Sequence, residues 1–566
     1  MQHRIPRRPA FVLFSLLTRV SFAFAALIFG LTLASRAWAA WPETGVGVSQ
    51  APGNQTMAGL VSDGHGGSFA LWATISIQDP AHPLLFVQHL SPGGSPTWGK
   101  DGVPVATTEG FQFESAIVSD AQGGVIVAFD ERPSLTTGPF QVIVQRLSVS
   151  GKREWGESGV IVSSGGEPAL AADGSGGAIV VFAQGLSLLA QHVGSGGSLL
   201  WDQQGIPVAS GSGLPLAVSD GSGGAVVAWA NIPFTTGYTG GAQRLSGDGS
   251  ALWSQAGVAL SHVPRALASD GQGAFLIAGF RNDPNGEGVL LQKFDEKGAE
   301  IWAPGGVLAS ASMADMSELL IASDGGGGAF LSWLQAPGDP SESGVKAQHA
   351  DASGAVLWTS DGVSAAPPGN VGFSHPMSPD GEGGLYVAST PRLANGTMDL
   401  ASLHLNSSGT ALAPANLLAH VVADLVLGAA DDRGNAFLGW TAYARSFYVE
   451  PARSFVARLS DPSAKQAAQL RPAMTSLPAR ASAIAAIAPN PARGSFNASG
   501  VLPGNDPARV DLIDLRGRVV ASRLIVPVAG AWSAWFGGAT HLASGTYVLR
   551  VIQGSAVSLA KVSLLR

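Results

Sequence analysis

The chain has 566 residues, of which 13% are charged, 75 are Gly and 35 are Pro, and its formal net charge is −8. This length predicts two or more folded units, and the composition, rich in Gly and apolar residues, predicts short strands joined by tight turns rather than helices or disorder. The absence of Cys excludes disulfides, thiolate metal sites and a cysteine nucleophile.

The first 39 residues have the pattern of a secretory signal peptide. Basic residues at positions 4–8 precede an apolar run at 21–34, and Ala37-Trp38-Ala39 places small residues at the two positions that a signal peptidase reads. We therefore expect cleavage after Ala39 and a bacterial protein that is secreted or held at the cell surface. A retained membrane anchor is the alternative, which Arg19 disfavours because it interrupts the apolar stretch.

The predicted leader contains five Arg and no acidic residue, so the exported chain would hold 27 basic and 40 acidic residues. A dispersed acidic balance of this kind argues against nucleic acids and anionic membranes as partners. We expect a monomer with no transmembrane span after processing.

An Asp-centred turn recurs eight times, at intervals of 47 to 57 residues, typically as Ser-Asp-Gly-x-Gly-Gly. The turn residues are Asp63, Asp120, Asp173, Asp220, Asp270, Asp324, Asp380 and Asp431. A period near fifty residues with strand-like content is the signature of a radial or stacked repeat.

Each repeat unit divides into four short strands. The first strand leads into the Asp turn and the second leaves it. An aromatic residue stands nine positions after the Asp in six units, as Trp72, Phe129, Phe182, Trp229, Trp333 and Trp440. The third strand ends in a motif such as Gln243-Arg244-Leu245. The fourth segment starts at Trp98, Trp155, Trp201, Trp253, Trp302 and Trp358, with Ala413 at this position of the seventh unit.

Four antiparallel strands with Gly-rich turns and one large aromatic residue per unit are typical of a β-propeller blade. We predict an all-β protein with an eight-bladed β-propeller over residues 40–460; seven blades is the alternative, and the coils of a β-solenoid are usually shorter than fifty residues. Residues 41–48 resemble a fourth segment standing alone before the first turn, whereas the eighth unit has none after it. We therefore expect the N-terminal strand to complete the last blade and close the ring.

The turn Asp is expected to be structural, because its side chain can accept backbone N–H bonds two residues on. One carboxylate per turn is too few for the six to eight oxygens that Ca²⁺ binds, so no cofactor is assigned, with Ca²⁺ left as the weaker option. The turns loosely resemble the Asp-boxes of sialidase-type propellers, which are also structural.

The repeated Trp resembles the tryptophan-docking motif of eight-bladed quinoprotein propellers, with a spacing one residue shorter and mostly without the Asp of that motif. The vicinal cysteine pair of many such dehydrogenases is impossible in this chain. The resemblance therefore implies wedges between blades rather than a quinone site.

A basic residue occupies an equivalent position in all eight units, as His89, Arg146, His192, Arg244, Lys293, His349, His404 and Arg458. If these side chains surround a central channel, they form a ring that suits an anionic ligand. The alternative is that each pairs locally with an acid or covers apolar surface with its stem.

No nucleophile elbow, His-Glu-x-x-His pair, phosphate loop or zinc spacing is present, so no catalytic, cofactor-binding or metal-binding residue is assigned. Asp130, Glu131 and Glu287 lie outside the repeated turns, follow no shared pattern and are expected to be solvated loop charges. The number of acids nevertheless leaves room for a carboxylate pair that hydrolyses glycosides.

The periodicity stops after Leu459. Residues 461–485 are rich in Ala, Pro and Ser and are expected to be a linker. A different unit is expected over residues 486–566.

This last unit combines four motifs: Pro489-Asn490-Pro491, an Asp-Leu-x-Gly-Arg stretch at 514–518, a Ser-Gly-x-Tyr stretch at 544–547 and a basic-ended last strand. Together they resemble the C-terminal immunoglobulin-like modules of exported bacterial proteins, of the flagellar hook-assembly-protein type and the type IX secretion sorting type. The resemblance implies a small β-sandwich that serves sorting or surface attachment. The alternation of residues 510–513 and 546–551 independently fits sandwich strands.

The sequence thus predicts an exported, non-catalytic β-propeller that binds a glycan, peptide or protein partner, followed by a domain that engages secretion or surface-attachment machinery. One alternative is a secreted hydrolase or lyase acting on polysaccharide. Another is a structural component of a surface layer.

Overall fold

The computed structural model describes residues 41–458 and 483–565, with gaps. The longer gaps lie at 76–82, 133–138, 232–238, 337–343, 367–374, 391–398, 431–435, 444–451, 502–507, 514–518, 526–530 and 537–544, and the others span one to three residues. The predicted signal peptide, Ala413, Asp431 and most of the predicted linker lie outside the described residues. Within the described ranges every regular element is a β-strand, and no helix is long and apolar enough to cross a membrane.

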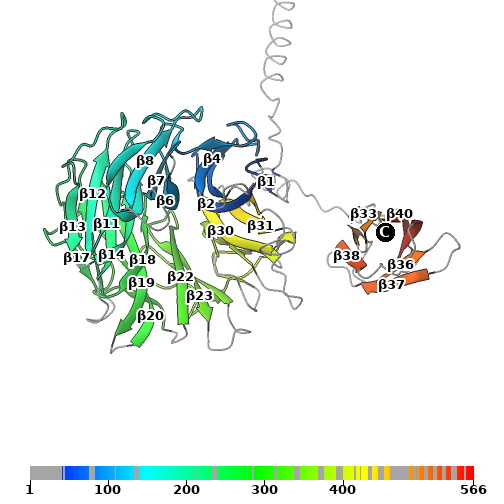
Figure 1. Cartoon of the computed structure of the whole chain (residues 1–566). Helices are drawn as coiled ribbons and strands as arrows, with labels where there is room; N and C mark the ends of the chain where they lie inside the picture. The colour runs from blue at the N-terminus through cyan, green and yellow to red at the C-terminus, as the bar shows by residue number, and fades with distance from the viewer. Residues whose placement is uncertain are drawn as a thin grey trace, which may run out of the picture. The chain divides into compact units, whose positions relative to one another are not determined.

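The chain forms two compact units, residues 1–464 and 465–566, which are described separately. The described part of the first unit contains eight four-stranded antiparallel sheets, consistent with propeller blades (Figure 1). The all-β prediction and the division of each unit into four strands are therefore confirmed.

The first four sheets follow the chain directly. Their strands are β2 (Asn54–Ser62), β3 (Ser68–Ile75), β4 (Leu84–Leu90) and β5 (Val103–Pro104); β6 (Phe111–Ser119), β7 (Val125–Arg132), β8 (Gln141–Leu147) and β9 (Val160–Ser164); β10 (Gly166–Ala172), β11 (Ala178–Gln184), β12 (Ser187–Val193) and β13 (Ile206–Ser210); β14 (Ser212–Ser219), β15 (Ala225–Asn231), β16 (Gly240–Leu245) and β17 (Val258–Leu260).

The other four sheets repeat the pattern, except that the last one takes its fourth strand from the N-terminus. Their strands are β18 (Val263–Ser269), β19 (Phe275–Asp283), β20 (Gly286–Phe294) and β21 (Val307–Ser310); β22 (Asp315–Ser323), β23 (Ala329–Ala336), β24 (Gly344–Ala350) and β25 (Val363–Ser364); β26 (Met377–Pro379), β27 (Leu385–Ser389), β28 (Asp399–Leu405) and β29 (Asn416–His420); β30 (Val422–Ala430), β31 (Ala436–Tyr443), β32 (Arg453–Arg458) and β1 (Val46–Gly47).

The first strand of each sheet contacts the first strand of the next sheet, and β30 contacts β2. At this junction β1 pairs with β32, with Val46 opposite Val456. Strands from the two ends of the first unit, drawn in blue and yellow, accordingly lie side by side (Figure 1).

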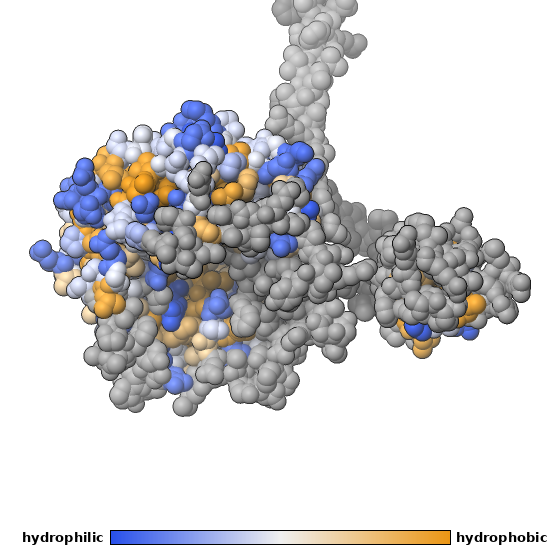
Figure 2. All heavy atoms as spheres, in the orientation of Figure 1, coloured by the Kyte–Doolittle hydropathy of each residue, from blue (hydrophilic) through white to orange (hydrophobic). Residues whose placement is uncertain are grey.

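The core of the first unit lies between the sheets. One apolar cluster, for example, joins Phe69 and Leu71 on β3 to Val125 and Val127 on β7. Both faces of the second strand of a sheet are covered by neighbouring sheets, so runs such as Val125–Asp130 are buried continuously. The face in view carries a mixture of hydrophilic and hydrophobic side chains (Figure 2).

The second unit consists of two sheets that share one apolar core. One sheet has the order β33 (Ala483–Ala488), β35 (Phe496–Val501) and β38 (Ala531–Phe536). The other has the order β34 (Ala492–Arg493), β40 (Ala556–Leu565), β39 (Gly545–Gln553), β36 (Ala508–Ile513) and β37 (Val519–Ile525).

Side chains from both sheets meet in that core, including Phe496 and Phe536 from the first and Leu512 and Leu549 from the second. The predicted strands at 510–513 and 546–551 are confirmed as parts of β36 and β39. Strand β33 begins at Ala483, whereas the domain was expected to start at residue 486. The Pro-Asn-Pro and Asp-Leu-x-Gly-Arg motifs lie outside the described residues.

Candidate functional site

The repeated Asp holds the turn between the first two strands of its sheet. In the first copy, Oδ1 of Asp63 accepts hydrogen bonds from the backbone N–H of His65 at 2.7 Å and of Gly67 at 2.8 Å. The N–H of Asp63 in turn donates to the carbonyl of Gly67 at 3.1 Å. The same three bonds recur at Asp120, Asp173, Asp220, Asp270, Asp324 and Asp380.

These hydrogen bonds stabilise the ionised form of the turn carboxylate. Burial acts to raise the pKa of Asp63, but the bonds from His89, His65 and Gly67 outweigh it and hold that pKa below its usual value. The pKa is lowered in the same way at Asp173, Asp270, Asp324 and Asp380.

The repeated basic residues bind the second oxygen of these carboxylates. His89 Nε2 lies 2.9 Å from Oδ2 of Asp63, and Arg146 Nε donates to Oδ2 of Asp120 at 2.8 Å. The remaining described pairs are His192–Asp173, Arg244–Asp220, Lys293–Asp270, His349–Asp324 and His404–Asp380, at 2.8–3.0 Å. The eighth base, Arg458, donates to the carbonyl of Pro92 at 3.5 Å, and its turn Asp431 lies outside the described residues.

At seven of the eight positions, the basic side chain therefore pairs with the Asp of its own turn. These seven do not form a ring of free cations facing a channel. The repeat explains why: the end of the third strand lies beside the start of the second, as the pairing of Phe69 with His89 shows, so the base is next to its own Asp turn.

The repeated Trp connects adjacent sheets. Its indole N–H donates to a backbone carbonyl in the turn between the third and fourth strands of the next sheet. These bonds, at 2.9–3.1 Å, join Trp98 to Val149, Trp155 to Ser195, Trp201 to Gly247, Trp253 to Glu296, Trp302 to Ala352 and Trp358 to Ser407. The predicted wedge role is thus confirmed for the described copies.

In four of the described sheets the base and the Trp bind the same carbonyl of the neighbouring sheet. Arg244 Nη1 and Trp253 Nε1, for example, lie 2.9 Å and 3.1 Å from the carbonyl oxygen of Glu296. A buried Gln just before the base completes the arrangement: Oε1 of Gln243 accepts the N–H of Trp253, and Nε2 donates to the carbonyl of Ser254. This Gln stands before the base in six of the eight units and was noted in the third-strand motif, but no role was predicted for it.

The sheets differ where their first strands bulge. The register of the first strand against the second shifts once in seven of the eight sheets. A bulge inserts an extra residue and re-aims its side chain. The bulges place Ala58 on β2, Glu167 and Pro168 on β10, Pro215 on β14, Arg265 on β18 and Glu318 on β22.

Two of these bulge residues have an unusual backbone. Glu167 and Glu318 have φ values of +55° and +53°, in the left-handed region that non-glycine residues rarely adopt. Such conformations persist where the surroundings enforce them and concentrate at functional positions. At Glu167, the buried Asp130 supplies part of that enforcement, because its Oδ2 accepts the Glu167 N–H at 3.1 Å.

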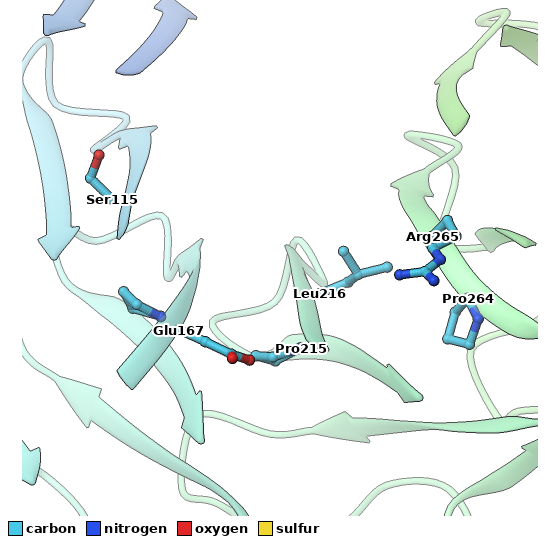
Figure 3. Close-up of a pocket in the computed structure, with 7 residues that line it drawn as sticks. Ser115, Glu167, Pro215, Leu216, Pro264 and Arg265 are labelled. Atoms are coloured by element: carbon cyan, nitrogen blue, oxygen red, sulfur yellow. The ribbon is translucent and has the colours of Figure 1, made fainter. Parts of the chain in front are cut away.

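A cavity of about 460 Å³ lies at the bulges of β6, β10, β14 and β18. Its walls are Ser115, Glu167, Pro168, Pro215, Leu216, Pro264 and Arg265. Glu167 and Arg265 are exposed and point into the space from opposite sides, with Pro215 and Leu216 between them (Figure 3). The cavity therefore offers an anionic and a cationic group on a wall stiffened by proline.

A second hollow of about 400 Å³ adjoins the first, because Glu167 lines both. Its lining includes Asp130, Phe140, Ser164, Gly165, Gly166 and Gln184. Neither hollow contains one of the repeated bases or turn carboxylates. None of the residues that line the first cavity was predicted from the sequence as a site residue.

Two of the acids expected to be solvated loop charges are instead part of strand β7. Asp130 is only 2% exposed and lies directly before Glu131, which accepts a hydrogen bond from the hydroxyl of Thr108. The expectation was wrong for Asp130, because the second strand of the sheet continues to Arg132 and keeps residue 130 between neighbouring sheets. Glu287 lies on β20 opposite Asn282. Within the described ranges, no group of three or more His, Asp or Glu residues is close enough to hold a metal ion.

No known family and no curated protein matches the sequence of this chain. Solved structures match its fold. Prolyl oligopeptidase B from Galerina marginata is 8% identical and matches 69% of this chain and 55% of its own, with a TM-score of 0.40.

Two further structures illustrate the range of proteins with similar folds. PorZ, a surface component of the type IX secretion system of Porphyromonas gingivalis, is 11% identical over 92% of this chain and 100% of its own, with a TM-score of 0.18. SapL1 lectin, solved with alpha methyl fucoside, is 13% identical over 54% of this chain and 96% of its own, with a TM-score of 0.30. At these values the similarities carry no inference about ligand or activity.

Proposed function

We propose that this protein is an exported, non-catalytic β-propeller that binds a partner molecule at the adjoining hollows around Glu167. The observation that carries the proposal is the cavity at the bulges of the first strands, where the sheets differ from one another and Glu167 and Arg265 are exposed. Its volume lies within the range of about 300–1,000 Å³ typical of small-ligand sites. The candidate ligands of this site are glycans, peptides and segments of a partner protein.

The proposed propeller has eight blades and is closed by the N-terminal strand. The pairing of β1 with β32 and the contact of β2 with β30 support closure. The repeated Asp, base, Gln and Trp belong to this scaffold, because their polar groups bind one another and the next sheet. Binding specificity then resides in the bulge residues, which differ from blade to blade.

The second unit is proposed to deliver or anchor the protein through secretion or surface-attachment machinery. Its two-sheet core fits the sandwich that the motif resemblance implies. Together with the leader-like residues 1–39, it supports a secreted or cell-surface protein.

A polysaccharide hydrolase or lyase is the second candidate. The observation that favours it is that two carboxylates, Asp130 and Glu167, line one hollow, as glycosidases require of their acid and base. A surface-layer component is the third, and it requires the full chain to self-assemble.

The test uses the processed chain, residues 40–566, on glycan and peptide arrays, with product formation and self-assembly measured on the same samples. We expect a ligand to be retained without turnover, and Arg265→Gln or Glu167→Gln to weaken its binding at least tenfold, about 1.4 kcal/mol. Lys152→Gln, at an exposed site outside both hollows, is the control and should bind as wild type does.

Three results would contradict the binding proposal. Turnover that disappears in Asp130→Asn would establish the enzyme instead. Ordered assembly without any ligand would favour a surface-layer role. A ligand whose binding is indifferent to both Arg265 and Glu167 would place the site elsewhere.

A further inference from the structure

The second hollow lies beside the short connection between β11 and β12 in the third sheet. Strands β11 and β12 are joined through Gly185 and Leu186 alone, with Gln184 paired to Ser187. Three glycines, Gly165, Gly166 and Gly185, form part of the lining and present no side chain. A Cβ at Gly165 would come within 2.6 Å of the carbonyl oxygen of Ala183, so only glycine fits at this position.

The hollow contains one aromatic wall, Phe140. The guanidinium carbon of Arg132 lies 3.7 Å from the centre of this ring and therefore covers one of its faces. Phe140 is half-buried and lines the hollow. Apolar C–H groups of a ligand can pack against an aromatic wall of this kind.

Polar groups surround the aromatic wall and are held in place. Nε2 of Gln184 donates to the carbonyl and to the hydroxyl of Ser164, at 2.8 and 2.9 Å, which fixes the amide at the rim. Glu167 is exposed, and its backbone is fixed through Asp130. The exposed Glu167 carboxylate and Oε1 of the held Gln184 amide are both acceptors, so they suit ligand hydroxyl groups, which can donate to them.

Charge decides between ligand classes. Among the described residues that line the hollow are two carboxylates and no Lys, Arg or His, and the guanidinium beside it, that of Arg132, lies on the Phe140 ring; an anionic ligand therefore meets a net negative lining. A cationic ligand packed on the other face of the Phe140 ring would be repelled by the guanidinium of Arg132, which lies on the first face. A neutral, hydroxyl-rich ligand with an apolar face meets neither obstacle.

We propose that this hollow binds a neutral saccharide unit, with the sugar face against Phe140 and its hydroxyls on Glu167 and Gln184. The inference rests on the proposed binding function and specifies its ligand. The adjoining cavity at Arg265 would then receive a neighbouring part of the same glycan.

The experiment titrates the processed chain with cellohexaose, maltohexaose, xylohexaose and mannohexaose, and with a chitosan hexamer and an oligogalacturonate as cationic and anionic probes. Calorimetry and saturation-transfer NMR report binding. We expect at least one neutral hexasaccharide to bind with a Kd of about 1 mM or tighter. The charged probes should bind at least tenfold more weakly.

Two variants and one control locate the site. Phe140→Ala and Glu167→Gln should each weaken binding of the neutral sugar at least tenfold. Glu318→Gln is the matched control, because Glu318 is an exposed bulge glutamate with nearly the same φ but lines neither hollow. Circular dichroism and thermal unfolding of every variant distinguish lost binding from lost fold.

The inference is overturned if no neutral hexasaccharide binds, if a charged probe binds best, or if Phe140→Ala binds as wild type does. Its failure is distinguishable from failure of the proposed function. If no neutral hexasaccharide binds but a peptide does, and its binding depends on Arg265, the proposed function stands and only the saccharide assignment fails.

Discussion

Single residues in the two sheets that depart from the repeat show how packing controls ionisation. The position nine residues after the turn Asp is aromatic in six sheets, but in the fifth it is Gly279. The His262 ring lies against this glycine, since a Cβ there would come within 2.4 Å of its Cδ2. His375, just before the first strand of the seventh sheet, is a second buried histidine at 1% exposure.

Burial lowers the pKa of His262 from 6.5 to about 4, and no hydrogen-bond partner for its ring nitrogens is found among the described residues. The folded protein therefore keeps the ring neutral at pH values where the unfolded chain protonates it. Because the pKa is lower in the folded state, the free energy of unfolding falls as the pH drops from about 6.5 to about 4. The loss of stability is largest below about 4. At pH 5 the loss amounts to about 2 kcal/mol.

We therefore predict that His262→Leu reduces the acid sensitivity of the fold. Urea unfolding at pH 7 and pH 5 should show a smaller drop in the free energy of unfolding for the variant than for the wild type, by about 2 kcal/mol. His65→Gln, at an exposed turn residue, should leave the drop unchanged. Equal drops in wild type and His262→Leu would mean that the buried ring does not resist protonation.

At the scale of the sheet, a contact between one sheet's Trp and a Gly of the next sheet recurs wherever the described units have the Trp. The Trp253 ring lies against Gly298, where a Cβ would come within 2.7 Å of the ring's Cγ. The φ of Gly298 is +82°, a conformation that side chains disfavour. Nearby Gly305 has a φ of +81° but open space around its Cα.

Comparison of Gly298 with Gly305 distinguishes the cost of a positive φ from the cost of disturbing the Trp contact, because the two glycines have nearly the same φ and only Gly298 touches a Trp. We predict that Gly305→Ala costs about 1–2 kcal/mol of stability through φ alone, whereas Gly298→Ala costs at least about 1 kcal/mol more because the methyl group displaces Trp253. Thermal unfolding of the two variants measures the difference. If both lose the same stability, the Trp–Gly contact can relax without cost and is not what holds neighbouring sheets together.

The sequence predicted what every unit repeats, because eight copies of a spacing reveal which positions the fold requires. It predicted the turn role of Asp63 and the wedge role of Trp253. It left the base beside the turn undecided between a local pair and a ligand ring, because strand pairing, not spacing, decides which acid it meets.

The features that were not predicted from the sequence as parts of the candidate site occur in single units. Asp130 occupies a position that is Ala in the first, third and fourth units, so its departure from the repeat was visible in the sequence. The positive φ of Glu167 was not, because it depends on a bulge in β10 and on the carboxylate of a different sheet.

At the scale of the whole molecule, the proposed ring closure places the N-terminal segment in the position of an interior one. Trp41 donates its indole N–H to the carbonyl of Pro92 at 3.0 Å and lies against Gly94. Trp155 makes the equivalent bond to Ser195 inside the series, also at 3.0 Å. Trp41 thus repeats between the last and first sheets the contact that the interior tryptophans make between consecutive sheets.

Comparison of these two tryptophans tests closure. In a closed ring every interface supports all the others, so Trp41→Ala should destabilise the propeller about as much as Trp155→Ala, by about 3–5 kcal/mol for a well-packed Trp and less where the ring is partly exposed. Deletion of residues 41–48 should cost more still, because it also exposes the edge of β32. In an open array, by contrast, loss of Trp41 would only fray one end, and the main unfolding transition would stay at its wild-type temperature while Trp155→Ala lowered it.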